Sequence, residues 1–482
     1  MLPIPNDALT LAIDVGTSSV RALILNQDGE ALENVFAQER YQADTTADGG
    51  VTFDADQMVQ RVLTCIETVL QAAGAAVSRV RAVAMDTLVS NLVGVSGEGQ
   101  PVTPVYTWAD TRGSDMIGKL RQRLEQNGLS PESYIQATGC RLHTSFWPLR
   151  LLWLAEQEQF KRVAYWMSIG EYVYFRLFGQ RRVSLSVASW TGLLNRHRLN
   201  WDDRVLEAVG IRREQLSELS GEPLTGMLSK WPELQGARWF PAIGDGVASN
   251  IGAGCTVPGF VALSVGTSGA LRVVVPGTPE KVPDGLFAYR VDARRTLVGG
   301  SLSNAGNLYA WMQGLLKFPD NLEKEIAIMQ PDSHGLTILP FLAGERAPGW
   351  NPAAESVFVG MRLHTTPAQM VCAGLEAIAY RFGQVAERLG PLLPPQFACV
   401  ASGAAILNSP TWMQIMADVL NAPVYATVDH ETTIRGAVYL ATGHEPEPRL
   451  SQRYDPDPGR HAVYSVAMDR QKALYQRMFG SG

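Results

Sequence analysis

One four-residue sequence occurs twice in this chain, half a chain length apart. Val-Gly-Thr-Ser stands at 15–18 and returns 250 residues later at 265–268. Apolar runs flank both copies, LAIDVGTSSVRALIL at 11–25 and VALSVGTSGALRVVV at 261–275, so each reads as strand, tight turn, strand. A repeat at this offset favours duplication of a whole unit. Single hydrophobic cores stop growing at about 250–300 residues, and this chain has 482. The sequence therefore predicts two related lobes of nearly equal size.

The remaining segments alternate between strand and helix patterns. Residues 9–15 and 80–85 are apolar runs typical of buried strands, and residues 54–57 form a helix cap followed by apolar residues every three or four positions. In the second half, Thr366-Pro367 and Ser409-Pro410 each combine a capping residue with a proline at the first helical position. This alternation predicts an α/β fold.

Charge, cysteine usage and absent motifs exclude several classes of protein. There are 41 lysines and arginines and 47 aspartates and glutamates, so the net charge of −6 disfavours a protein that binds nucleic acid by electrostatics. Five scattered cysteines without a C-x-x-C pair argue against a disulfide framework and a zinc site, and indicate a reducing compartment. Neither the Walker nor the Rossmann glycine motif occurs, which makes a Rossmann-type dehydrogenase a poor candidate.

No segment predicts membrane association. The first ten residues, MLPIPNDALT, lack the basic and apolar regions of a signal peptide. Residues 246–271 carry no charge, but Pro258 and several glycines and polar residues interrupt them, which disfavours a membrane helix. We therefore expect a cytoplasmic protein with neither a membrane nor a nucleic-acid partner.

The two repeated turns have the composition of phosphate-binding loops. Glycine lets the backbone approach a ligand, and consecutive N–H groups with Thr and Ser hydroxyls form an anion-binding nest. The first copy adds Asp14, which suits Mg²⁺ directly or through water, and Arg21, which suits a phosphate; the second copy has Ser264 in place of the aspartate. Taken alone, each turn favours an ordinary hairpin turn. Two such turns facing one another favour binding of a polyphosphate.

Longer motifs resemble the FGGY family of carbohydrate kinases over almost the whole chain. The matching segments are IDVGTSSVRA (13–22), TWADTR (107–112), TGCRLH (138–143), GDGVASNIGAG (244–254), LSVGTSGALR (263–272), FLAGERAPGWN (341–351), SVFVGM…QMVCAGLE (356–376) and ASGAAILNSPTWMQIMADVLNAPV (401–424). The resemblance implies two actin-like, ribonuclease H-like ATPase domains with an active-site cleft between them. It implies a sugar-binding N-terminal domain at 8–250, a nucleotide-binding C-terminal domain at 251–482, and ATP and Mg²⁺ as cofactors.

The resemblance also implies catalytic and cofactor-binding residues. Asp245, in a Gly-Asp-Gly turn, is implied to be the general base that takes the proton from the attacking hydroxyl. Without the family, Asp245 reads equally as a turn-forming aspartate. Asp14 is implied to hold Mg²⁺. The implied phosphate and nucleotide contacts are Gly16, Thr17, Ser18, Arg21, Gly266, Thr267, Gly306, Gly403 and Asn408. A tight turn or helix start is the competing interpretation for these glycines.

The implied sugar-binding residues, besides Asp245, lie in two further motifs. Trp108, Asp110 and Arg112 belong to a loop whose polar groups suit sugar hydroxyls and whose arginine suits a carboxylate, with a surface ion pair as the alternative. His143 either contacts substrate or is merely packed. Ser90 stands where xylulokinase-like and gluconokinase-like relatives carry a sugar-contacting histidine, which leaves the sugar open.

Within the family, GCRLH, SVASWTGL (186–193) and GERAPGWN most resemble gluconokinases. The implied activity is ATP-dependent phosphorylation of a sugar or sugar-acid hydroxyl, gluconate to 6-phosphogluconate first among them. Xylulose, ribulose, erythritol and glycerol are alternative substrates, and a non-catalytic ATP-binding regulator on the same fold is the alternative from another class. Glu345 and Arg346 are expected to stabilise the second domain or its hinge. The oligomeric state stays open, with a homodimer as one option.

Overall fold

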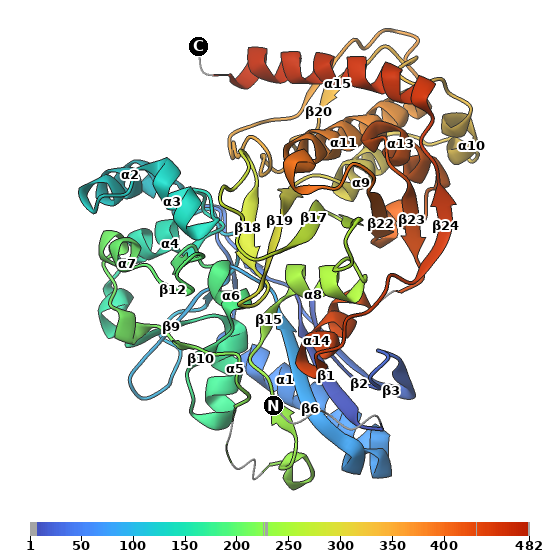
Figure 1. The fold of residues 1–482 in the computed structure, drawn as a ribbon. Helices are drawn as coiled ribbons and strands as arrows, with labels where there is room; N and C mark the ends of the chain where they lie inside the picture. The colour runs from blue at the N-terminus through green and yellow to red at the C-terminus, as the bar shows by residue number, and fades with distance from the viewer. Residues whose placement is uncertain (1–6, 225, 227–229, 430, 481–482) are drawn as a thin grey trace.

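The computed structural model describes residues 7–224, 226, 230–429 and 431–480. Residues 1–6, part of the segment in which the sequence predicts no signal peptide, lie outside this range. Figure 1 shows an N-terminal sheet in blue, a second sheet above it from the C-terminal half, and a group of helices in cyan and green to one side. The two sheets hold the duplicated turns, so their arrangement decides what those turns can reach.

The N-terminal sheet has the strand order β14-β6-β1-β2-β3, with β15 also paired to β6. Its strands are β1 (Leu9–Val15), β2 (Ser19–Leu25), β3 (Ala31–Arg40), β6 (Val80–Thr87), β14 (Arg238–Trp239) and β15 (Ile243–Gly244). β1 pairs antiparallel with β2 and parallel with β6. β1 is buried along its whole length, as expected of a central strand covered on both faces.

The C-terminal sheet repeats this arrangement. Its order is β18-β19-β17-β16-β22-β23-β24, built from β16 (Phe260–Val265), β17 (Gly269–Pro276), β18 (Phe287–Arg290), β19 (Arg295–Leu302), β22 (Ala398–Ser402), β23 (Val424–Thr427) and β24 (Leu450–Tyr454). β16 pairs antiparallel with β17 and parallel with β22, as β1 does with β2 and β6. The predicted duplication of a strand–turn–strand unit is therefore confirmed.

Helices flank both sheets, and three of them begin where the sequence predicts a helix start. In the N-terminal half these are α1 (Ala55–Ala73), α2 (Ile117–Gln126), α3 (Pro131–Thr138), α4 (Trp147–Leu154), α5 (Ile169–Phe178), α6 (Leu185–Ser189), α7 (Asp203–Val209) and α8 (Asp245–Gly252). In the C-terminal half they are α9 (Gly306–Leu315), α10 (Leu322–Ala327), α11 (Pro367–Leu389), α12 (Ala404–Leu407), α13 (Pro410–Leu420), α14 (Thr432–Thr442) and α15 (Pro458–Phe479). The side chains of Asp54, Thr366 and Ser409 cap α1, α11 and α13.

Short strands complete the two halves. They are β4 (Asp44–Thr45), β5 (Val51–Phe53), β7 (Val93–Val95), β8 (Val105–Tyr106), β9 (Tyr165–Met167), β10 (Arg182–Val183), β11 (Leu194–Asn195), β12 (Asn200–Trp201), β13 (Glu218–Leu219), β20 (Thr337–Leu339) and β21 (Val357–Val359). Among the described residues, no helix is both long and apolar enough to cross a membrane. The uncharged stretch 246–271 lies instead in α8, β16 and the start of β17. All five cysteines are buried and unpaired.

Two helices cross where the halves meet. α14 follows β23 of the C-terminal sheet but packs on α8 and on β1 and β6 of the other sheet (Figure 1). Glycines permit the crossing: a Cβ at Gly436 would lie 1.8 Å from the carbonyl oxygen of Ala248, and one at Gly252 would lie 1.7 Å from that of Thr432. The proposed domain boundary between residues 250 and 251 falls inside α8, and it stays a prediction.

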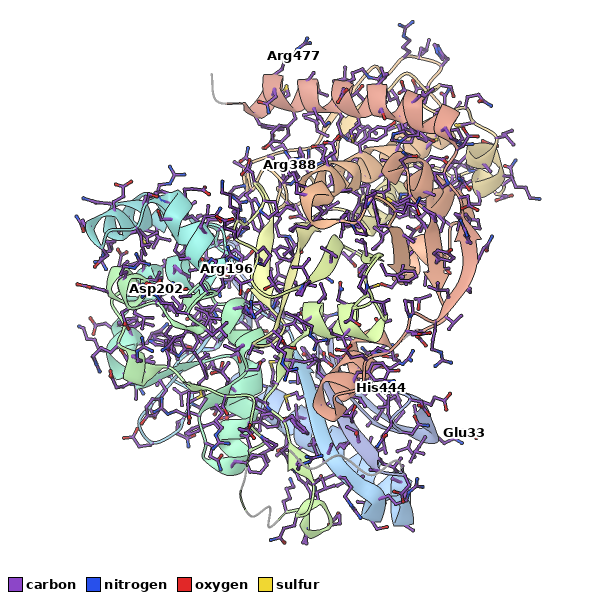
Figure 2. All side chains as sticks on the ribbon, viewed as in Figure 1. Glu33, Arg196, Asp202, Arg388, His444 and Arg477 are labelled. Atoms are coloured by element: carbon purple, nitrogen blue, oxygen red, sulfur yellow. The ribbon has the colours of Figure 1, made fainter. Side chains whose placement is uncertain are left out.

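Buried arginines join the helical region of the N-terminal half to the C-terminal half on the other side. Arg196, labelled in Figure 2, donates from Nη1 to the carbonyl of Pro279 at 2.6 Å and from Nη2 to that of Glu280 at 3.2 Å. Arg141 donates to the carbonyls of Leu286 and Pro283, each at 2.9 Å. The halves are thus tied together on both sides of the space between them.

Candidate active site

A cavity of about 230 Å³ lies between the halves, and both repeated turns border it. Its walls include Thr17 from the first turn, Ser268 and Gly269 from the second, and Asp245 at the start of α8. The other lining residues are Val89, Ser90, Trp108, Ser145, Phe146, Trp190, Ser264, Ala270, Arg272, Phe287, Tyr289, Ser301, Arg346 and Trp350. The fold therefore brings the predicted base and the two predicted phosphate loops to one place.

The first turn connects β1 to β2 and exposes its two hydroxyl-bearing residues. The Gly16 N–H donates to the Ser19 carbonyl at 3.0 Å, which closes the turn, and Thr17 and Ser18 are exposed. Asp14 and Arg21 are register partners across the hairpin, and Arg21 Nε donates to Asp14 Oδ2 at 2.9 Å. The predicted group of Asp14, the turn and Arg21 is therefore one local unit.

The second turn is surrounded by the other predicted nucleotide-binding glycines. The Gly306 N–H donates to the Gly266 carbonyl at 2.9 Å, and the N–H of Asn307 donates to that of Thr267 at 3.1 Å. Gly403 has a φ of +99°, and a Cβ there would lie 2.4 Å from the carbonyl oxygen of Val265. These glycines are needed because three backbone segments meet closely.

Asn408 closes α12, a short helix that starts directly after Gly403, and it is exposed. Asn408 is not among the residues that line the cavity. The nucleotide roles of this group of residues stay predictions.

Asp245 occupies the first position of α8, directly after β15 in the N-terminal sheet. It is partly open to the cavity but lies deep in the protein, and this burial raises its pKa from 3.8 to about 6. The positive charges of Arg272 and Arg346 act in the opposite direction and lower it. A carboxylate with a pKa close to neutrality can accept a proton and release it again, as a general base must.

Two arginines that were not predicted to bind substrate line the same cavity. Nε of Arg272 and Nε of Arg346 are buried, and neither has a hydrogen-bond partner among the described residues. Burial lowers the pKa of both guanidiniums, that of Arg346 to about 10, and Arg346 therefore stays charged near neutral pH. Among the described residues that line the cavity, Asp245 is the only carboxylate, so two arginines face one acidic side chain.

A sequence signal for Arg272 exists. The uncharged stretch 246–271 begins directly after Asp245 and ends directly before Arg272, so its two flanking charges face the same cavity. Arg272 also stands alone among apolar residues of a strand, where a buried charge requires a partner. Arg346 was expected to support the hinge, whereas the structure places it in the cavity wall.

Aromatic side chains form the rest of the wall. Arg346 lies over the ring of Trp108 with 4.9 Å between the guanidinium carbon and the ring centroid. Trp190 stacks on Tyr289 with their centroids 3.8 Å apart. Ser90 also lines the cavity, and its hydroxyl donates to the Trp190 carbonyl at 2.8 Å. Ring faces of this kind suit the C–H faces of a sugar chain, with polar groups at the edges.

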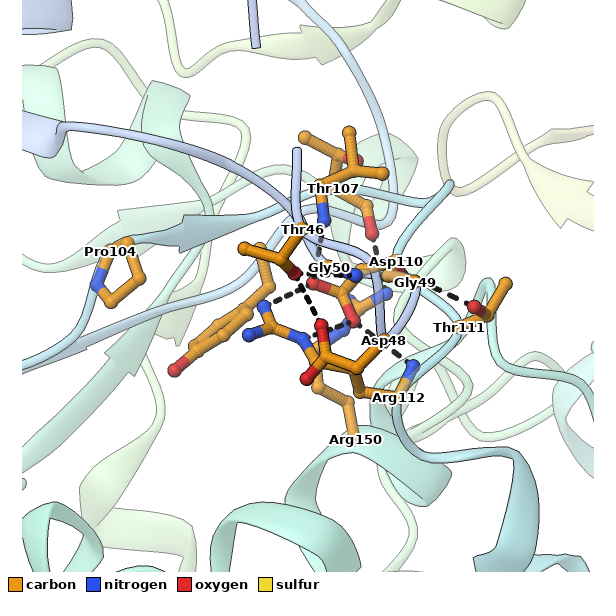
Figure 3. Close-up of polar contacts among 12 residues, drawn as sticks. Thr46, Asp48, Gly49, Gly50, Pro104, Thr107, Asp110, Thr111, Arg112 and Arg150 are labelled. Carbon is orange, nitrogen blue, oxygen red and sulfur yellow. Dashed lines mark hydrogen bonds and ion pairs between the residues drawn. The ribbon is translucent and has the colours of Figure 1, made fainter. Parts of the chain in front are cut away.

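Asp110 and Arg112 do not line the cavity, although both were predicted to bind substrate. Figure 3 shows that Asp110 instead fixes the loop near Gly49 and Gly50: it accepts from the N–H of Val51 at 3.0 Å and from Arg112 Nη2 at 2.5 Å. The exposure of Asp110 is only 2%, so its ion pair with Arg112 does not match the alternative of a surface ion pair either. The contact of Asp110 and Arg112 with sugar stays a prediction, and the position of neither residue supports it.

His143 lies one layer behind the cavity. Its Nδ1 accepts from the N–H of Ser145 at 3.1 Å, and its ring packs edge-on against Trp350 with centroids 5.3 Å apart. Burial first, and then the charge of Arg346, lower its pKa to about 4. His143 is therefore neutral at physiological pH, and its predicted contact with substrate would be indirect here. Glu345 is buried beside Arg381, as a stabilising role requires.

The first turn also carries oxygens that suit a divalent cation. The Asp14 carboxylate lies beside the turn, 3.6 Å from where a Cβ on Gly16 would be. Asp86, its register partner on β6, has two buried carboxylate oxygens without a hydrogen-bond partner among the described residues. Carboxylate oxygens are the ligands that Mg²⁺ prefers. The residues present therefore fit the predicted Mg²⁺, with Asp14 as its predicted ligand. Asp86 was recognised in the sequence only as the end of a strand.

Comparison with known proteins gives similar relatives over nearly the whole chain. Gluconokinase from Bacillus subtilis (strain 168) is 26% identical over 470 residues, which cover 90% of this chain and 87% of that protein. Glycerol kinase from Citrifermentans bemidjiense is 30% identical over 453 residues, 89% of each chain. The crystal structure of a ligand-bound xylulose kinase from Lactobacillus acidophilus superimposes with a TM-score of 0.89 at 24% identity, covering 98% of this chain and 99% of that one.

Two family models match consecutive parts of the sequence. The model for the N-terminal domain of FGGY carbohydrate kinases matches residues 9–232, and the model for the C-terminal domain matches residues 261–443. Together with the two-lobed α/β fold and the cavity between its halves, these matches establish that the chain belongs to the FGGY family of carbohydrate kinases.

Proposed function

We propose that this protein phosphorylates a hydroxyl of a sugar acid, gluconate first, with ATP as the phosphate donor. The observation that carries this proposal is the cavity between the halves, where Asp245 shares a wall with the buried guanidiniums of Arg272 and Arg346. A neutral sugar would leave these donors without an anionic partner, at a cost in binding free energy, whereas a carboxylate would satisfy one or both. The sequence similarity to gluconokinase supports the same substrate.

The chemistry follows from the placement of the side chains. Asp245 accepts the proton of the attacking hydroxyl, and the arginines hold the carboxylate at the other end of an open-chain substrate. The two glycine turns offer N–H and hydroxyl donors to the phosphates. When bound near Asp14, Mg²⁺ would neutralise charge on the phosphates. Because the cavity lies between the halves, small movements around α8 and α14 would admit substrate and then exclude water.

A coupled kinase assay over gluconate, xylulose, ribulose, erythritol and glycerol tests the substrate. We expect turnover of gluconate, with a KM for gluconate that rises about 10–100-fold in Arg272→Gln, the range for losing a hydrogen bond to a charged group. Arg272→Lys is the matched control that keeps the charge and should lose less. Turnover of a neutral sugar in preference to gluconate, with no effect of Arg272→Gln on KM, contradicts the sugar-acid assignment.

The same assay tests the base and the non-catalytic alternative. Asp245→Asn should lose at least about 10²-fold in kcat, the scale of general-base catalysis, while it keeps gluconate binding. Near-normal turnover by this variant would remove Asp245 from its proposed role. ATP hydrolysis that no sugar in the panel stimulates would favour an ATP-binding regulator over a kinase.

A further inference from the structure

Asp86 lies beside Asp14 on the neighbouring strand. The two residues are register partners on the parallel strands β1 and β6. Side chains of such partners emerge on the same face of a sheet. Both lie at the carboxyl ends of their strands, the edge where ligands bind in open α/β sheets. Asp86 is therefore placed to act on whatever Asp14 binds.

The charges around Asp86 are not balanced. Its side chain is 0% exposed, and neither carboxylate oxygen has a hydrogen-bond partner among the described residues. Asp14 and Asp245 place two further negative charges near it. Arg21 is a nearby cation, but it donates its hydrogen bonds to Asp14 and Glu431.

A buried carboxylate without a partner destabilises the folded protein unless a positive charge comes to it. The predicted ligand here is a triphosphate, which would add more negative charge beside Asp14 and Asp86. A divalent cation bound by oxygen atoms from both aspartates would remove this conflict, because it pairs with the carboxylates and the phosphates at once.

We propose that Asp86, together with Asp14, is a direct carboxylate ligand of the divalent cation that accompanies the nucleotide. This inference rests on the proposed kinase function only for the presence of the nucleotide. It assigns to Asp86 a binding role that is separate from the base Asp245 and from the sugar-binding arginines. The cation class is a hard ion such as Mg²⁺ or Mn²⁺, because every protein ligand is a carboxylate oxygen.

Binding of Mn²⁺ measured directly tests the inference without turnover. Free Mn²⁺ is followed by its electron paramagnetic resonance signal during titration of the protein with saturating ADP. We expect Asp86→Asn to weaken Mn²⁺ binding at least about tenfold, the lower end of the losses caused by removing groups that support a metal site. Asp14→Asn should weaken it as well. Unchanged Mn²⁺ affinity in Asp86→Asn, with a loss in Asp14→Asn, overturns the inference and leaves the proposed kinase function standing.

Thermal unfolding in the absence of cation and nucleotide separates ligation from a structural role. If Asp86 is a ligand, Asp86→Asn replaces a carboxyl group buried beside Asp14 with a neutral amide of the same shape, so the variant should unfold at a higher temperature than the wild type. A lower temperature, together with normal Mn²⁺ affinity, means that Asp86 has a structural role, which refutes ligation. The control Asp202→Asn changes another buried carboxylate, which accepts hydrogen bonds from Asn195 and Arg204. It should unfold earlier and bind Mn²⁺ normally.

Discussion

The proposed base should reduce the stability of the protein that carries it. Asp245 is held in a deep cavity where burial favours its neutral form, and the arginines nearby only partly offset this effect. Asparagine has nearly the same shape and is neutral at every pH. Its side-chain oxygen can also accept the Gly246 N–H that Asp245 Oδ1 accepts at 2.7 Å. Asp245→Asn should therefore stabilise the folded protein while it abolishes most turnover.

The magnitude follows from the shift in pKa. A rise from 3.8 to about 6 is roughly two units, and each unit corresponds to about 1.36 kcal/mol. Above the folded pKa, the wild type bears the full unfavourable contribution of Asp245 to its folding free energy, which Asp245→Asn removes. This contribution is at most about 3 kcal/mol, because water in the cavity weakens the effect of burial. Below the unfolded pKa both forms are protonated and the difference vanishes. At pH 5 the expected gain of the variant is about half of its value at pH 8.

Urea denaturation of the wild type and Asp245→Asn at pH 8 and pH 5 tests this reasoning. The control is Asp202→Asn in the helical region labelled in Figure 2. Burial alone would raise the pKa of Asp202, but hydrogen bonds from Arg204 and Asn195 lower it overall, so this variant should lose stability at pH 8. The reasoning is refuted if Asp245→Asn is no more stable than the wild type at pH 8, or if its gain is undiminished at pH 5.

Three further outcomes follow from the same geometry. The value of kcat/KM should fall about tenfold per pH unit below about pH 6, where Asp245 becomes protonated. In Arg272→Gln this fall should begin at higher pH, because the positive charge that lowers the pKa of Asp245 is gone; identical profiles would contradict this effect of Arg272. Gly436→Ala should lower the unfolding free energy by about 1–3 kcal/mol or more, because its Cβ would meet the Ala248 carbonyl at 1.8 Å; wild-type urea stability would contradict a close crossing of α8 and α14. Asp110→Asn should lower the melting temperature but change the KM for gluconate less than about threefold, a value within the small effects of residues outside a binding site; a large rise in KM at normal stability would restore its predicted sugar contact.

The sequence predicted most of the local structure because its signals are local. Asp54, Thr366 and Ser409 cap helices where the sequence places them. The repeated turns at Gly16 and Gly266 also lie between paired strands, as the apolar runs around them indicate. Capping and turn formation involve residues only a few positions apart, so the pattern in one segment suffices.

The composition of the cavity could not be deduced in that way. Arg272 lies on β17 and Arg346 in a loop more than seventy residues later. The sequence around Arg272 marks it as a charge among apolar residues, but nothing in either segment shows that the two arginines share a cavity. Asp110 and Arg112 have a spacing that suits sugar hydroxyls, but their side chains pair with each other, and their contact with sugar stays a prediction. Motifs identify the residues of a family but do not fix which side of a loop they face.

The sequence by itself determined the duplicated α/β plan, the two phosphate-type turns and a carboxylate beside them. Tertiary structure alone decided that Asp14 and Asp86 stand side by side, and that Asp245 shares its cavity with two guanidiniums whose Nε atoms have no hydrogen-bond partner among the described residues. The physical reason is that the charge balance of a buried site depends on groups brought together across strands and lobes. The distances between these groups are set by the packing of the two sheets around α8 and α14, so no single segment of the sequence specifies them.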